Sequence, residues 1–291
     1  MVNTSSVVQV WISRAPNSTT PKFVRRSLHS AQEYALLHGY RYSLHTHVHT
    51  NTTLLHPSWQ RIPYLLDALE TSQLAAYFDA DVIITNQQLR LDSLFRACGP
   101  RTELILISNS DALKCCGCCL HKCPCLINNG ILVMRNTPFI KDLLTSMLQS
   151  LPCRPFYQVR QWEQDCLQQR LKELRELPEI VARYWGRRVM RSKSERVCVM
   201  PRDNVAPWKV SVHAAMTARG TWRGLSTPPL AIHLVDERGW SGSSPNAKLA
   251  ELHRGLGHIV AVPNASCIGA GAITPTCSIN SPPPPSSAGG Y

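Results

Sequence analysis

Two aspartates separated by one residue, Asp79 and Asp81, directly follow the apolar run Leu74–Phe78. In an open α/β sheet, ligands bind at the carboxyl ends of the strands, so paired carboxylates at such a point are well placed for chemistry. Their hard oxygens suit Mg²⁺ or Mn²⁺, which also bind phosphate oxygens and water. The pattern indicates a cation-assisted site for a phosphate-bearing ligand, and a solvated turn after a core strand is the alternative.

A second group of potential ligands is the segment Cys115–Cys125, which holds six of the twelve cysteines and His121. Thiolates and imidazole bind zinc, but the segment lacks paired cysteine knuckles separated by about 12 to 20 residues, which are typical of a zinc module. Disulfides in an oxidising compartment and free thiols in a reducing one are both compatible with it. We favour a variable loop over a zinc site.

Three histidines, His45, His47 and His49, alternate along the chain. This spacing predicts that they share one face of a strand. A metal-binding strand is one interpretation, and a half-exposed edge strand with polar residues is the one that we favour.

The charge balance is strongly basic, with 31 Lys and Arg against 19 Asp and Glu and a formal charge of +12. Such an excess attracts polyanions, namely nucleic acid, anionic membranes or phosphorylated small molecules. The densest basic run is Arg183–Arg196, which is typical of a solvated face. Only Tyr184 and Trp185 could stack on bases there, so we rank nucleic-acid binding last and expect no nucleic-acid partner.

Strand and helix patterns alternate along the chain and must position these residues. Strands are predicted at 6–13, 41–48, 74–78, 103–108, 131–135 and 230–233. Helices are predicted from Pro21 until Gly39, at 61–71, from Pro138 with Thr137 as its cap, and at 161–177. This alternation favours an α/β fold with a mostly parallel sheet flanked by helices.

The C-terminal part of the chain differs in composition from the rest. From Gly255 to Tyr291 there is no Asp, Glu, Lys or Arg, and the sequence ends in SPPPPSSAGGY. We therefore expect a single domain at residues 1–261 and a disordered Pro/Ser/Gly tail at 262–291. No stretch of about 20 apolar residues and no signal-peptide pattern occur, so we expect neither a membrane anchor nor a signal peptide.

Several blocks occur in the order found in one enzyme family. They are SLHSAQEYALLHGY at 27–40, WQRIPYLLDAL at 59–69, the Asp-x-Asp strand at 77–81, NNGILVMRNT at 128–137 and WEQDCL at 162–167, with a weaker block, PLAIH, at 229–233. The chain resembles the nucleotide-diphosphosugar glycosyltransferases with a GT-A (Rossmann-like) fold, specifically the galactosyl/xylosyl/mannosyltransferase family 34. That family contains the yeast α-1,2-galactosyltransferase and plant xyloglucan xylosyltransferases.

The resemblance implies retaining transfer of a hexose or pentose from a UDP- or GDP-sugar to a glycan hydroxyl. It implies that Asp79, Asp81 and His233 bind Mn²⁺ or Mg²⁺. It places Glu163, Gln164 and Asp165 at the catalytic centre. The residues that it implies for donor and acceptor binding are Ser13, Arg14, Arg61, Asp79, Asn128, Asn129, Gly130 and Arg238. It also implies that Asn128, Asn129 and Gly130 form a loop that faces the donor sugar and the acceptor, which would place the variable loop Cys115–Cys125 beside the acceptor site.

The late motif departs from the family pattern. The family usually has "H-F-x-G-C", whereas this chain has His233-Leu234-Val235-Asp236-Glu237. A non-catalytic binding protein of the same fold therefore stays open as the alternative, followed by a basic Cys-rich protein that binds metal or nucleic acid. The resemblance implies the Golgi lumen, and without an anchor the cytoplasm is the other expected location.

Overall fold

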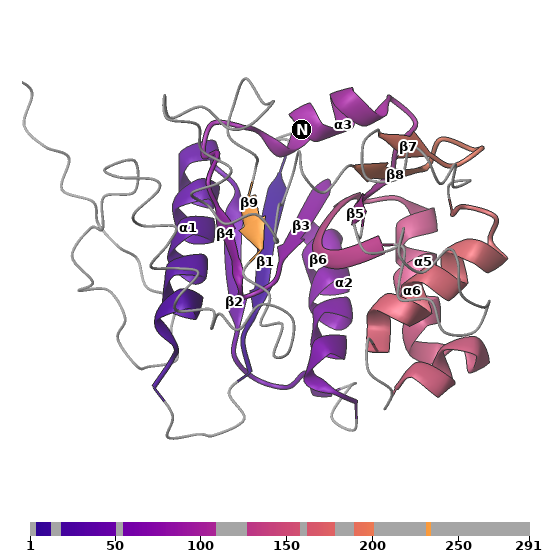
Figure 1. The fold of residues 1–291 in the computed structure, drawn as a ribbon, viewed down its shortest axis with the longest axis horizontal. Helices are drawn as coiled ribbons and strands as arrows, with labels where there is room; N and C mark the ends of the chain where they lie inside the picture. Colours follow the sequence, from indigo (N-terminus) through magenta and orange to yellow (C-terminus); the bar gives the residue numbers. More distant parts are fainter. Residues whose placement is uncertain are drawn as a thin grey trace, which may run out of the picture. The chain divides into compact units, whose positions relative to one another are not determined.

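A seven-stranded sheet with helices on both faces forms the centre of the fold (Figure 1). The protein is described from a computed structural model, which covers residues 4–12, 19–50, 55–108, 127–157, 162–177, 189–200 and 231–233. In spatial order the strands are β2 (Arg41–His45), β1 (Ser5–Val10), β3 (Leu74–Phe78), β6 (Ile127–Arg135), β5 (Leu104–Ser108), β8 (Val197–Met200) and β7 (Met190–Arg191).

Most strands of this sheet run in one direction. β2, β1, β3, β5 and β8 are parallel to one another, and β6 and β7 run against them. β1 lies between β2 and β3, with Val7 opposite Tyr42 on one side and Ala76 on the other. The expected α/β class, with a mostly parallel sheet flanked by helices, is confirmed.

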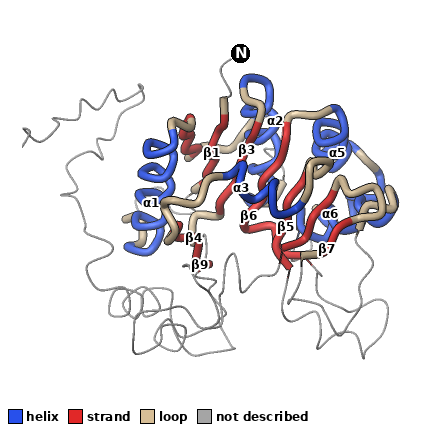
Figure 2. The backbone as a smooth tube through the Cα atoms, turned by 90° about the horizontal axis from the view of Figure 1, so that it is seen from above, coloured by secondary structure: helices blue, strands red, loops and turns tan. Residues whose placement is uncertain are grey.

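The helices divide between the two faces of the sheet. They are α1 (Lys22–His38), α2 (Arg61–Thr71), α3 (Leu91–Cys98), α5 (Pro138–Gln149) and α6 (Trp162–Glu173). Two 3₁₀ helices, η2 (Pro57–Gln60) and η3 (Leu151–Phe156), precede α2 and α6, and β4 (Val82–Ile84) pairs with β9 (Ala231–His233) in a small second sheet. Residues of α1 and α3 pack on one face, and residues of α2, α5 and α6 pack on the other. Figure 2 shows α1 and α2 on opposite sides of β1 and β3.

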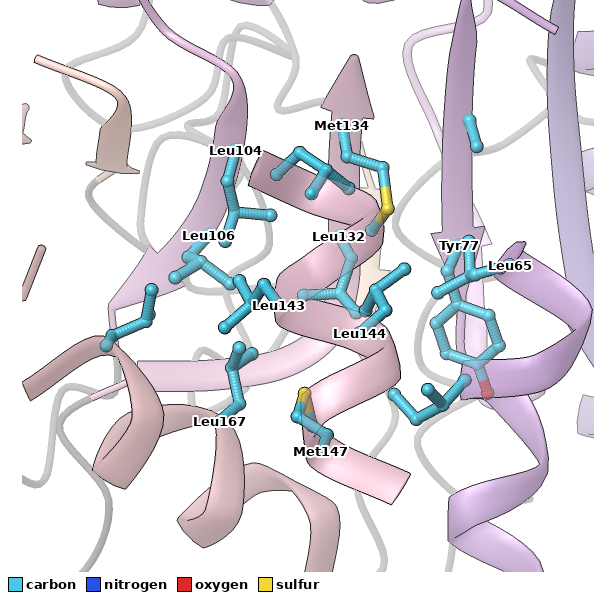
Figure 3. Packing of buried hydrophobic residues seen from close by; sticks show 14 of the residues in the cluster. Leu65, Tyr77, Leu104, Leu106, Leu132, Met134, Leu143, Leu144, Met147 and Leu167 are labelled. Carbon is cyan, nitrogen blue, oxygen red and sulfur yellow. The ribbon is translucent and has the colours of Figure 1, made fainter. Parts of the chain in front are cut away.

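Two hydrophobic cores result from the alternation of side chains along the strands. On β3, Ala76 and Phe78 belong to the α1/α3 core, whereas Ala75 and Tyr77 belong to the α2/α5/α6 core. Figure 3 shows the second core, in which α5 residues pack toward β5 and β6 and Leu65 of α2 lies beside Tyr77. Because both faces are covered, β3, β5 and β8 are buried throughout and almost continuously apolar.

Local sequence signals account for several helix ends. α1 ends at Gly39, whose φ of 67° is left-handed and favours glycine at the C-terminus of a helix. Thr137 caps α5, because its Oγ1 accepts a hydrogen bond from the Ile140 backbone N–H at 3.4 Å. The predicted ends of α1 and α2 and the cap of α5 are confirmed.

Two sequence predictions about strands are wrong. β2 ends at His45, so His45, His47 and His49 do not share one strand face. β6 begins at Ile127 and not at residue 131, so Asn128, Asn129 and Gly130 lie in a strand and not in a loop. Near the start of β6, Asn128 pairs with Ile107 of β5 and the Gly130 carbonyl accepts from the Asp79 backbone N–H, so pairing with neighbouring segments keeps this polar stretch extended.

The chain divides into two compact units, Met1–Gly255 and Leu256–Tyr291, and every described element belongs to the first. The predicted tail at 262–291 and the segment Cys115–Cys125 lie outside the described residues. Within the described ranges, no helix combines the length and the apolar character needed to cross a membrane.

Candidate active site

The two aspartates of the sequence motif lie in a turn that connects β3 to β4. The backbone N–H of Asp79 donates to the Gly130 carbonyl at 2.8 Å, which extends the pairing of β3 with β6 by one residue. The Val82 N–H donates to the Asp79 carbonyl at 2.9 Å and closes the turn. Asp79 and Asp81 are therefore held at the carboxyl end of a buried strand, as the sequence predicted.

The strand alternation also brings Tyr77 and Asp79 together, because residues i and i+2 of a strand lie on the same face. The Tyr77 hydroxyl donates to Asp79 Oδ1 at 2.8 Å. The Arg61 guanidinium lies over the Tyr77 ring, 4.5 Å from its centre, and its Nη2 is 2.8 Å from the same Asp79 oxygen. Sequence analysis singled out Asp79 and Arg61 but missed Tyr77, although its position two residues before Asp79 was a usable signal.

Arg61 is the first residue of α2, and it connects four parts of the site. Its Nε donates to the Ser58 carbonyl at 3.1 Å, and its Nη1 donates to the Asn129 carbonyl at 2.9 Å. Its Nη2 pairs with both Asp79, at 2.8 Å, and Glu163 Oε1, at 3.3 Å. The residue is only 7% exposed, so these contacts replace hydration of the cation.

The charge of Arg61 follows from these contacts. Burial lowers the pKa of a guanidinium, but Asp79, Tyr77 and Glu163 outweigh the burial and raise the pKa of Arg61 above its ordinary value. Burial is also the main reason that the pKa of the Tyr77 hydroxyl is raised well above 10. Arg61 is thus a permanent cation, and Tyr77 is a neutral hydrogen-bond donor.

Glu163 lies in the first turn of α6, where the helix dipole favours a negative charge. It is 3% exposed, and its Oε1 accepts from the Asn129 side-chain amide at 3.2 Å besides pairing with Arg61. Its Oε2 is buried and has no hydrogen-bond partner among the described residues. An unpartnered buried polar atom costs about 1–3 kcal/mol, so Oε2 indicates a position for a bound polar group or water.

The start of β6 presents backbone groups to α6. The pairing of β6 with β5 shifts register between Ile105 and Ile107, so β6 is irregular around Asn129 and Gly130. Such irregularities re-aim side chains and are common next to active sites. The Asn129 N–H donates to Gln164 Oε1 at 3.1 Å, and the Gly130 N–H donates to Asn128 Oδ1 at 2.9 Å.

A cavity of about 350 Å³ opens beside Arg61 at the carboxyl ends of β1 and β3. Ligand pockets are typically about 300–1,000 Å³. Polar and charged residues of the Asp-x-Asp turn form one part of the lining, and apolar residues that follow β1 form another. The lining residues are Val10, Trp11, Ile12, Phe23, Pro57, Ser58, Arg61, Tyr77, Asp79, Ala80 and Asp81.

The apolar part of this lining was not foreseen, since sequence analysis chose Ser13 and Arg14. Trp11 and Ile12 come directly after β1, and Phe23 lies in the first turn of α1. Their position at a strand end was an available signal. Ser13, Arg14 and Arg238 lie outside the described residues.

The predicted cation ligands are brought together in part. β9 pairs antiparallel with β4, and the Cα of His233 lies opposite that of Val82, so the backbone of His233 is next to the Asp-x-Asp turn. The side chain of His233 lies outside the description. Among the described residues, no three His, Cys, Asp or Glu side chains form a metal-binding group. Asp79 and Asp81 supply two carboxylates of the kind that Mg²⁺ and Mn²⁺ prefer.

Of the predicted catalytic residues, Glu163 and Gln164 both contact Asn129, and Asp165 follows in the same helical turn. The structure therefore joins Arg61, Asp79, Asn129, Glu163 and Gln164 in one connected network. Four elements that are separate in sequence contribute to it, namely the start of α2, the turn after β3, the irregular part of β6 and the first turn of α6.

Comparison with known proteins gives structural likeness only. No protein-family model matches the chain, and no curated protein matches it in sequence. A solved glycosyltransferase involved in glycosylation of the major capsid of PBCV-1 is 13% identical, with 86% of this chain and 99% of that chain covered and a TM-score of 0.49. The galactosyltransferase LgtC, solved with donor and acceptor sugar analogues, is 12% identical, with 89% and 98% covered and a TM-score of 0.47.

Mouse xyloside xylosyltransferase 1 is also similar in structure, with 12% identity, 78% of this chain and 96% of that chain covered, and a TM-score of 0.41. These similar solved structures are glycosyltransferases. At such identities and TM-scores, the likeness by itself assigns neither a family nor an activity to this chain, so its function has to be argued from the site.

Proposed function

We propose that this chain is a glycosyltransferase of GT-A-like fold, which transfers a hexose or pentose from a nucleotide-diphosphate sugar to a glycan hydroxyl with retention of configuration. The observation that carries the proposal is the position of Arg61. This buried cation lines the cavity and pairs with Asp79, and it also pairs with the buried carboxylate of Glu163. Arg61 would thus link two parts of the site, a phosphate-binding end at the Asp-x-Asp turn and a reacting end at Glu163.

The cavity suits the nucleotide part of such a donor. Trp11, Ile12 and Phe23 offer apolar surface for a flat base, and the Asp-x-Asp turn at the other part of the lining offers oxygen ligands. The carboxylates of Asp79 and Asp81 would hold a Mn²⁺ or Mg²⁺ ion together with His233, whose backbone lies next to their turn. When bound, such an ion neutralises the charge that develops on a diphosphate leaving group.

The remaining residues would act on the sugar. In the transfer, the bond from the anomeric carbon to the diphosphate oxygen breaks, and a bond from that carbon to the acceptor oxygen forms. The acceptor hydroxyl gives its proton to the departing phosphate oxygen. Positive charge accumulates on the sugar in the transition state, and the carboxylate of Glu163 would stabilise it. Its unpartnered Oε2 supports this role, because a group that arrives with the substrate can complete it.

Arg61, Asn129 and Gln164 would keep this carboxylate in place. Arg61 and the Asn129 side chain both contact Glu163 Oε1, and the Gln164 side chain accepts from the Asn129 backbone. Such support lets the charged group meet the transition state without reorganisation. The membership of family 34, the choice between UDP and GDP sugars, and the Golgi location stay predictions from the sequence.

The test is transfer and hydrolysis of a panel of UDP- and GDP-sugars in the presence of Mn²⁺, with wild-type protein and Glu163→Gln. We expect Glu163→Gln to lower kcat by about 10²–10³-fold while nucleotide affinity changes little, because the charge is needed only in the transition state. The matched control is Glu173→Gln at the other end of α6, whose carboxylate pairs with Arg170 in the same helix.

Three outcomes are informative. A large loss of kcat for Glu163→Gln alone supports the proposal. Wild-type turnover in Glu163→Gln would move the chemistry to another residue, with Asp165 the next candidate in the same turn. Nucleotide-sugar binding without turnover by any donor would contradict the enzymatic proposal and favour a non-catalytic binding protein.

A further inference from the structure

The described part of the chain contains two disulfides, and one of them lies next to the candidate reacting end at Glu163. Cys153 of η3 is bonded to Cys166 of α6, which follows Glu163 by three residues. Residues three apart lie on neighbouring positions of a helix surface, so the disulfide and the carboxylate are fixed by the same turn. Cys98 of α3 is bonded to Cys198 of β8 in the other core.

Four of the described side chains of helix α6 are buried. They are Glu163, Cys166, Leu167 and Leu171. Leu167 and Leu171 pack in the α2/α5/α6 core, and the rest of the helix is rich in polar side chains. A helix of 12 residues is marginal in water by itself, so its contacts with the rest of the protein decide its position.

The contacts of this first turn depend on the exact position of α6. Glu163 is a buried charge and depends on Arg61 and Asn129 for compensation, and Gln164 accepts from the Asn129 backbone at 3.1 Å. A shift of α6 would break several of these contacts together. A covalent bond to η3, which packs against α6, opposes such a shift at the turn where it matters.

We infer that the Cys153–Cys166 disulfide is a positioning device for the reaction, which holds the first turn of α6 so that Glu163 and Gln164 stay against Asn129. This inference rests on the proposed function for its catalytic consequence. Neither cysteine is among the residues that line the cavity, and both are fully buried. The disulfide should therefore affect turnover more than binding of the nucleotide.

The second disulfide provides a matched control in the same molecule. Cys98 and Cys198 are equally buried, but they pack on the α1/α3 face and are 100 positions apart in the sequence instead of 13. In the chain-entropy model, the longer loop contributes more to stability. Removal of the control disulfide should thus lower the Tm more, and removal of Cys153–Cys166 should lower kcat more.

The experiment compares full-length Cys153→Ala/Cys166→Ala with Cys98→Ala/Cys198→Ala, well below the Tm of either. We measure kcat, the donor KM and hydrogen–deuterium exchange of the amides at 163–169. We expect the first variant to lose about 10- to 100-fold in kcat, since a displacement of about 1 Å can cost that much, with the donor KM nearly unchanged. Exchange at 163–169 should rise in this variant only.

If either variant does not fold, the folded wild-type protein is treated with graded dithiothreitol. Each equivalent delivers two electrons to one disulfide, which gives two thiols and the cyclic disulfide of the reagent. Mass spectrometry after alkylation then identifies the disulfide that has opened. We expect kcat to fall in proportion to the reduction of Cys153–Cys166 and to be insensitive to that of Cys98–Cys198.

The inference is overturned if exchange at 163–169 does not change without the Cys153–Cys166 bond, or if kcat stays at the wild-type level. Equal losses of kcat in both variants would also overturn it, because they indicate a general loss of stability. A wild-type protein without any transfer activity would contradict the proposed function and the catalytic part of the inference. The exchange measurement would still decide whether the disulfide holds α6.

Discussion

Replacement of Arg61 by methionine tests the centre of the site most directly. Methionine fills a similar volume but removes the cation that lies between Asp79 and Glu163. It also removes the donors to the carbonyls of Ser58 and Asn129. Glu163, at 3% exposure, would then be a buried carboxylate with only the Asn129 amide as its partner among the described residues.

The expected magnitude follows from the burial of the pair. Removal of one partner from a buried ion pair destabilises a protein by about 3–5 kcal/mol, because the other charge is left uncompensated. In a domain of this size, about 1 kcal/mol shifts the Tm by about 2–4 °C, so Arg61→Met should lower the Tm by about 6–20 °C. Arg61→Lys keeps the charge but cannot make all four contacts, so its effect should be intermediate.

The assay is urea unfolding at pH 7 with linear extrapolation, supported by thermal melts. Arg96→Met is the matched control, because Arg96 also pairs with a carboxylate, Asp92 at 3.1 Å, but its side chain is 69% exposed. An exposed pair contributes only about 0.2–1 kcal/mol. In addition, Glu163→Gln in the Arg61→Met background should cost less than in the wild type, since it removes the stranded charge.

Similar costs of about 1 kcal/mol or less for Arg61→Met and Arg96→Met would refute this reasoning. The same holds if Glu163→Gln costs equally much with and without Arg61. Either result would mean that Arg61 does not compensate a buried carboxylate, and the proposed link between the two ends of the site would be lost.

Three further predictions concern other parts of the molecule. Asp81→Asn should weaken nucleotide binding in Mn²⁺ by about tenfold or more, to the level found in EDTA, as measured by calorimetry, and equal affinity with and without the cation would contradict the metal role. Burial lowers the pKa of His45, so the unfolded chain binds a proton more readily and stability falls as the pH drops below about 6.5. His45→Phe, which keeps an aromatic ring against Tyr64, should flatten this slope in urea midpoints measured from about pH 7.5 to 5, and an unchanged slope would exclude His45 as its source. Loss of the Cys98–Cys198 disulfide should cost about 4.7 kcal/mol of unfolding free energy, against about 3 kcal/mol for a loop of the size closed by Cys153–Cys166, and equal costs would contradict the loop argument.

Local patterns in the sequence determine a large part of this fold. The apolar run before Asp79 predicts a buried strand, and its end places both aspartates at the edge where parallel sheets bind ligands. Gly39 and Thr137 mark helix ends through their own backbone and side-chain preferences. These features depend only on residues within a few positions of one another, and so the sequence by itself is sufficient for them.

Local patterns are not sufficient at β2 and β6. The alternation of His45, His47 and His49 continues beyond the end of β2, because alternation reports only which residues can face one side if a strand is present. In contrast, the polar residues Asn128 and Asn129 lie in a strand because Asn128 pairs with Ile107 of β5 and the carbonyl of the next residue along, Gly130, accepts from the Asp79 backbone N–H. Pairing between strands decided both cases, and pairing is not a local property.

Only the tertiary structure decides how the site is assembled. Arg61 meets Glu163 because α2 and α6 pack on the same face of the sheet, and no spacing in the sequence encodes that contact. The backbone of His233 lies next to the Asp-x-Asp turn because β9 pairs with β4. Likewise, twelve cysteines allow many pairings, and packing selects Cys153 with Cys166. Contacts between distant segments depend on how whole faces pack, so the sequence supplied the candidate residues and the fold determined which of them meet.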